Sequence, residues 1–85
     1  MRTLAAIQHA VLEVIRSNPG IPINGSMVAE VGRCITAAVG RLDAVRVGVA
    51  AGQLQERGLL RCWYDEDNPD QFRWVLTHLA LEYLD

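Results

Sequence analysis

The strongest constraint on the fold lies late in the chain, in two runs with the composition of β-strands. Residues 59–64, LLRCWY, and residues 71–76, QFRWVL, are rich in aromatic and branched side chains, and the residues between them, DEDNPD, all favour turns. This pattern predicts an antiparallel hairpin. Trp63 and Trp74 lie on its two strands, so we expect the indoles to be neighbours across the hairpin and to stabilise it.

The residues before the hairpin have helical spacing. In residues 3–17 apolar side chains recur every three or four positions, which predicts a helix with one buried face, and the turn-forming residues in SNPGIPING end it. A second helix is predicted over residues 27–39, with Ser26 as its N-cap and Gly40 as its C-terminal stop.

Two further helices are predicted around the hairpin. Asp43 is a suitable N-cap for a third helix over residues 44–57, which Gly58 terminates. After the hairpin, Thr77 is placed to cap a short helix, HLALEYLD, whose Leu81 and Leu84 we expect to return to the core.

The length and the apolar content set the class of protein. The chain has 85 residues, of which 51% are hydrophobic, so we expect one domain spanning residues 1–85. No stretch approaches the roughly 18 uninterrupted apolar residues that a membrane helix requires. Gln8, His9 and Glu13 interrupt the apolar start, and no small-residue cleavage site follows it, so a signal peptide is not predicted. We therefore expect a soluble, cytoplasmic protein without a membrane partner.

Three helices, a two-stranded hairpin and a short final helix give a mainly α fold with a small β-hairpin, the arrangement of a winged helix-turn-helix domain. LQERGLL at residues 54–60, followed by the hairpin and by FRWVLT at residues 72–77, resembles the motif pair of PadR-like and MarR-like bacterial regulators. In those families a leucine and RGL end the recognition helix, and LT closes the wing. The resemblance covers roughly residues 44–81 and implies transcription regulation.

The sequence departs from those families in two respects. Ala80 stands where they usually have glycine, and many of them continue into a long dimerising helix, whereas this sequence stops at Asp85. We nevertheless expect a homodimer, joined through residues 3–17 or through the final helix.

The resemblance also fixes which side of the third helix faces outward. The inward side chains are then Val47, Ala50, Ala51 and Leu54, and the outward face holds Val45, Val49, Gly52, Gln53 and Glu56, with Arg46 and Arg57 on its flank. Only Gln53 and Arg46 of this face can donate hydrogen bonds to base edges in the major groove.

Two glycines inside the third helix need an explanation, because a helix-interior glycine costs about 1 kcal/mol relative to alanine. Gly48 and Gly52 suit the close approach of another backbone, either a DNA strand or a partner helix. The other explanation is tight packing of the third helix against the second.

The first functional hypothesis is a winged-helix transcriptional regulator that binds double-stranded DNA as a dimer. The third helix, residues 44–57, enters the major groove, where Arg46 and Gln53 contact bases while Arg33, Arg41 and Arg57 anchor phosphates.

The uneven distribution of charge motivates a second hypothesis. Residues 1–61 hold seven arginines and four acids, a balance of +3, whereas residues 62–85 hold one arginine and six acids, a balance of -5. Four of these acids, Asp65, Glu66, Asp67 and Asp70, occupy the tip of the predicted wing, where they oppose a phosphate contact unless the tip points away from the duplex. The alternative is therefore a protein-binding winged helix, an assembly module or an inhibitor of a nucleic-acid-handling complex. In it Val45, Gly48, Val49 and Gly52 form an apolar contact face and the acidic tip engages a basic protein.

No pattern in the sequence indicates catalysis. There is no phosphate-binding glycine loop, no nucleophile elbow, no HExxH motif and no Cys-His constellation, so we expect no catalytic residue and no enzyme activity. His9, His78, Cys34 and Cys62 lack the spacing of a ligand motif, and we therefore expect no metal and no cofactor.

Overall fold

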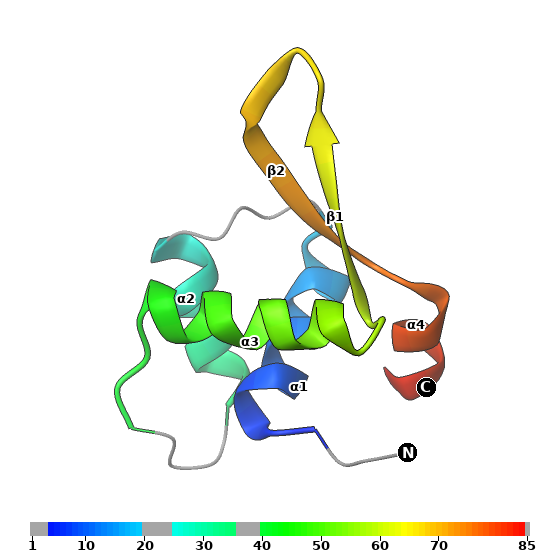
Figure 1. Ribbon diagram of the computed structural model, residues 1–85. Coiled ribbons are helices and arrows are strands. Elements are labelled where there is room, and N and C mark those ends of the chain that lie inside the picture. The colour runs from blue at the N-terminus through cyan, green and yellow to red at the C-terminus, as the bar shows by residue number, and fades with distance from the viewer. Residues whose placement is uncertain (1–3, 20–24, 36–39, 85) are drawn as a thin grey trace.

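The computed structural model describes residues 4–19, 25–35 and 40–84, and it has the predicted winged helix-turn-helix architecture. The elements are α1 (Ala6–Ser17), α2 (Gly25–Cys34), α3 (Ala44–Glu56), β1 (Leu60–Asp65), β2 (Asn68–Leu76) and α4 (His78–Leu84). α1, α2 and α3 pack together, and the antiparallel hairpin of β1 and β2 projects away from them (Figure 1). None of the helices in the described ranges combines the length and the apolar content that crossing a bilayer requires.

Helix α1 supplies the centre of the core, because it packs against both α2 and α3. Its buried apolar side chains are Ala10, Val11, Leu12, Val14 and Ile15. The helix begins at Ala6 rather than at the predicted Thr3, which lies outside the described residues. It ends at Ser17 as predicted, and the backbone N–H of Asn18 donates to the Val14 carbonyl at 2.8 Å.

Helix α2 differs from its prediction at both ends. It begins at Gly25, so Ser26 lies in its first turn and the prediction of Ser26 as N-cap is wrong. It ends at Cys34, although the Ile35 N–H still donates to the Val31 carbonyl at 3.2 Å. Residues 36–39, where the prediction placed its last turn, lie outside the described residues.

Helix α3 confirms the prediction closely. Asp43 caps its N-terminus, and Gly58 follows its C-terminal cap with φ 78, a left-handed conformation that glycine adopts without strain. The four side chains expected to face inward, Val47, Ala50, Ala51 and Leu54, are all buried.

The hairpin has a longer second strand and a tighter turn than predicted, and its first strand lies one residue later. Asp65 and residues 68–70 belong to the strands, which leaves Glu66 and Asp67 in the turn, and the register shifts between Tyr64 and Asp65. Cys62 pairs with Trp74 and Trp63 pairs with Arg73. Because directly paired residues share one face of a sheet, the two tryptophans lie on opposite faces, and the expected indole pair is wrong. Trp74 is 8% exposed in the core, and Trp63 is 49% exposed outside it.

The final helix is capped as predicted but turns a different face to the core. The Thr77 hydroxyl accepts a hydrogen bond from the Ala80 N–H at 3.4 Å. Ala80 is fully buried and Leu84 packs against the core, but Leu81 is 44% exposed, so its prediction as a core residue is wrong. Residues four apart on a helix share a face, and Ala80 and Leu84 have that spacing.

Candidate nucleic-acid interface

The outward face of α3 is exposed, as the sequence predicted. Val45 is 74% exposed and Val49 is 55% exposed, and Gln53 and Glu56 are also exposed. Both exposed fractions are large for valine, a residue type that proteins usually bury.

Gly48 and Gly52 lie on this open surface. No described atom beyond the helix's own backbone comes within 4 Å of the point where a Cβ would stand at either glycine. Tight packing against α2 therefore does not explain them. They leave a strip of α3 backbone that is not covered by side chains of the described residues.

Arg41 and Arg46 are joined by a hydrogen bond at the N-terminal end of α3. The Arg46 backbone N–H donates to Asp43 Oδ1 at 2.9 Å, and the Arg46 guanidinium donates through Nη1 to the Arg41 carbonyl oxygen. Gly40 sits in the same turn with φ 77. The turn thus places the Arg46 side chain against the backbone of Arg41, and both residues are exposed.

Gln53 is held by a residue that the sequence reasoning missed. Nε2 of Gln8, on α1, donates to Gln53 Oε1 at 2.7 Å, while Gln8 Oε1 accepts a hydrogen bond from the Ala5 backbone N–H at 3.2 Å. Gln8 is only 6% exposed. The sequence offered one signal for it, since glutamine three residues after a helix N-cap commonly caps the helix by this contact.

A groove of about 250 Å³ connects these groups. It runs between the start of α1 and the first three turns of α3, and its lining is mostly apolar. The lining residues are Ala5, Ile7, Gln8, Val45, Arg46, Val49, Ala50 and Gln53. The structure therefore brings together four residues that the sequence singled out, two as base contacts (Arg46 and Gln53) and two as apolar contacts (Val45 and Val49).

The remaining predicted phosphate contacts lie on separate elements. Arg33, near the end of α2, forms an ion pair with Glu30 and keeps 71% of its side chain exposed. Arg57 is exposed at the C-cap of α3, about 16 Å along the helix axis from Arg46 at 1.5 Å per residue. Arg33 and Arg57 thus lie outside the turn that holds Arg41 and Arg46.

The acidic wing tip is confirmed as a turn at Glu66 and Asp67, which are both exposed. Asp65 and Asp70 belong to the flanking strands, and their side chains lie outside the described part of the chain. The tip is far along the hairpin from the helices (Figure 1).

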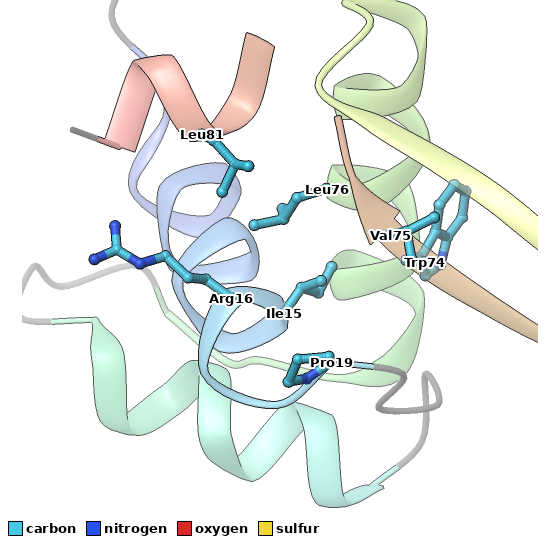
Figure 2. Close-up of a pocket in the computed structure, with 7 residues that line it drawn as sticks. All are labelled: Ile15, Arg16, Pro19, Trp74, Val75, Leu76 and Leu81. Atoms are coloured by element: carbon cyan, nitrogen blue, oxygen red, sulfur yellow. The ribbon is translucent and has the colours of Figure 1, made fainter. Parts of the chain in front are cut away.

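A second cavity, of about 210 Å³, lies away from the outward face of α3, where the end of α1, β2 and α4 meet. Ile15, Leu76 and Leu81 contribute its apolar lining, and the Arg16 guanidinium points away from these side chains (Figure 2). Among the described residues, no group of three or more His, Cys, Asp or Glu side chains is placed to hold a metal ion.

Comparison with known proteins gives a likeness in structure but not in sequence. No protein-family model and no curated protein sequence matches the chain. The PcaV transcriptional regulator from Streptomyces coelicolor, crystallised with its natural ligand, matches with a TM-score of 0.71 at 24% identity, over 93% of this chain and 49% of that one. A MarR-family transcription regulator matches with a TM-score of 0.72 at 16% identity, over 93% of this chain and 46% of that one.

The likeness confirms the winged-helix fold, and with it the expected structural resemblance to MarR-like regulators. The identities are too low to carry more than the fold. The chain spans about half the length of each of these two regulators.

Proposed function

We propose that the protein is a non-enzymatic transcriptional regulator that binds double-stranded DNA as a homodimer and places α3 in the major groove. The observation that carries the proposal is the outward face of α3. It is open, it is poor in side chains at Gly48 and Gly52, and it has the donors of Arg46 and Gln53 along one edge. Such a surface lets the backbone of α3 lie close to the walls of the DNA major groove, and its few polar side chains remain available to base edges.

The proposed roles follow the positions of the side chains. Arg46 and Gln53, which line the protein groove between α1 and α3, contact bases. Arg41, whose backbone carbonyl accepts from Arg46, anchors a phosphate. Arg33 on α2 and Arg57 at the end of α3 anchor further phosphates. A symmetric dimer reads two half-sites about 34 Å apart, one turn of B-DNA.

The protein-binding hypothesis has less support, because the two regulators compared above, which share the fold, act in transcription. The exposed Val45 and Val49 are compatible with either hypothesis, since thymine methyl groups also form apolar contacts in the major groove.

The test is a selection from a random duplex pool followed by affinity measurements over a range of salt concentrations. We expect the Kd to rise steeply with salt, and Arg57→Ala to lower the log-log slope by about 1. Arg16→Ala is the matched control, because Arg16 is exposed on α1 beside the second cavity and lies apart from α3. Its removal should leave the slope nearly unchanged. Failure to shift any duplex at low salt would reject the proposal.

A further inference from the structure

We infer that Gln8 of α1 determines which bases Gln53 reads, by turning the Gln53 amide so that its NH2 group, and not its carbonyl oxygen, is available to the DNA. This inference rests on the proposed function, and it names the base chemistry that the site selects. Bases that present acceptors in the major groove are favoured, and guanine is favoured most.

The orientation of Gln8 is fixed by the backbone. The Ala5 N–H can only donate, so the Gln8 side-chain atom that lies 3.2 Å from it has to be the oxygen, Oε1. The other end of the Gln8 amide is then Nε2, which can only donate. Because Ala5 is the N-cap of α1, the start of the helix determines the orientation of this side chain.

The orientation of Gln53 follows from that of Gln8. The Gln53 atom that lies 2.7 Å from Gln8 Nε2 has to accept a hydrogen bond, so it is Oε1. The two ends of a glutamine amide have nearly the same shape, and on an exposed residue they exchange by rotation. Here the exchange would bring two NH2 groups together and leave a donor of Gln8, which is only 6% exposed, without its acceptor.

The free end of Gln53 therefore carries two N–H donors. Guanine presents two acceptors in the major groove, N7 and O6, whereas adenine N7 and thymine O4 each offer one and cytosine offers only the N4 donor. The usual glutamine contact with adenine needs both ends of the amide to face the same base, whereas the hydrogen bond from Gln8 holds the oxygen end of Gln53 toward α1. We expect guanine to be preferred at the contacted position and cytosine to be the least favoured base.

Replacement of Gln8 by glutamate tests this directly. Gln8→Glu keeps the size of the side chain and an oxygen for the Ala5 N–H, but it replaces the donor that faces Gln53 with an acceptor. When that carboxyl is ionised, both of its oxygens can only accept, so Gln53 has to turn its NH2 toward residue 8 and its oxygen toward the DNA. The guanine-to-cytosine preference at the contacted position should fall by about tenfold, within the range for one base contact.

Three control variants separate orientation from stability. Gln8→Met has a similar size and no amide, so it should relax the preference without inverting it. Gln53→Ala should remove the preference at that position, and Gln8→Glu should cause no further change in preference when it is added to Gln53→Ala. A purely structural Gln8 would instead alter the Kd of all duplexes by the same factor and leave the base preference intact.

A measurement without DNA tests the orientation separately. In the wild type, exchange of the side-chain amide protons measured by NMR should be slow for Gln8 and fast for Gln53, and in Gln8→Glu it should become slow for Gln53. If the wild type selects a duplex whose preferred bases do not respond to Gln8→Glu, the inference is overturned. If no duplex binds, the proposed function fails and the base-reading role fails with it. Fast exchange at Gln8 would overturn the orientation itself.

Discussion

Asp43 Oδ1 accepts a hydrogen bond of 2.9 Å from the backbone N–H of Arg46, and this contact fixes the N-terminus of α3. The same arginine turns its guanidinium back to the Arg41 carbonyl. The helix cap, the proposed base contact of Arg46 and the proposed phosphate contact of Arg41 therefore belong to one turn, so loss of the cap should displace both arginines.

Removal of this cap should weaken both stability and DNA binding. Asp43→Ala is expected to lower the free energy of unfolding by about 1 kcal/mol, because one helix donor loses its acceptor. Asp43→Ser is the control and should retain most of that stability, since serine also caps helices. Urea unfolding measures the change, and duplex affinity of the two variants shows whether the turn positions Arg46. Equal stability of the alanine and serine variants would contradict the prediction.

Alanine at the two helix glycines should separate stability from binding. Gly48→Ala and Gly52→Ala are each expected to raise the free energy of unfolding by up to about 1 kcal/mol, because no described atom occupies the space that the new methyl group needs. The same methyl groups stand on the outward face and should weaken duplex binding. Gln55→Ala, on the same helix and exposed, is the control and should change neither quantity much. Stabilised variants with unchanged affinity would show that DNA does not approach this strip.

Two apolar residues of α3 should differ sharply in their effect on folding. Leu54→Ala is expected to cost about 2–5 kcal/mol, since Leu54 is fully buried and its loss leaves a cavity. Val49→Ala should change stability by less than about 0.5 kcal/mol, because Val49 is 55% exposed. Thermal and urea unfolding of the pair check the prediction. A large cost at Val49 would mean that this side chain is covered in the assembled protein.

Neutralisation of the wing tip should tighten binding to DNA. The quadruple variant Asp65→Asn, Glu66→Gln, Asp67→Asn and Asp70→Asn removes four negative charges near a polyanion, so we expect the Kd at low salt to fall a few-fold and the effect to fade as salt screens it. Glu82→Gln, exposed on α4, is the single-charge control. An unchanged Kd would mean that the tip lies beyond the reach of the duplex, and binding to a basic protein that depends on these acids would instead favour the protein-binding hypothesis.

The sequence predicts α3 well because all its signals are local. Asp43 caps it, Gly58 ends it, and the spacing of Val47 and Leu54 marks its buried face. The bounds of α2 were predicted less well, because Ser26, a residue type that favours the N-cap, lies inside the helix that begins at Gly25. Helix ends depend on tertiary contacts that a single segment does not contain.

The prediction that Trp63 and Trp74 are neighbours is wrong because the register of the two strands differs from the one that the prediction implied. The six residues between the predicted strands were assigned to the turn, but the strands extend into them and leave only Glu66 and Asp67. A difference of one residue in register moves a side chain to the other face of a hairpin. Trp74 therefore lies opposite Cys62 rather than Trp63.

The candidate site was only partly predictable. The exposure of Val45 and Val49 followed from helical spacing, but the contact between Gln8 and Gln53 joins residues 45 positions apart. Periodicity reports which face of a helix is polar, and it contains no information about which polar residue on another helix lies opposite. In the sequence, Gln8 was only an interruption of an apolar run.

The separation of the two indoles gives the protein an internal pair of optical probes. Trp74, at 8% exposure, should emit at short wavelength and shift to the red only when the core opens. Trp63, at 49% exposure, should emit as a hydrated indole and be quenched first by acrylamide. With phenylalanine placed at one or the other position, fluorescence can distinguish loss of the fold from events on the outer surface of the wing, without any added label.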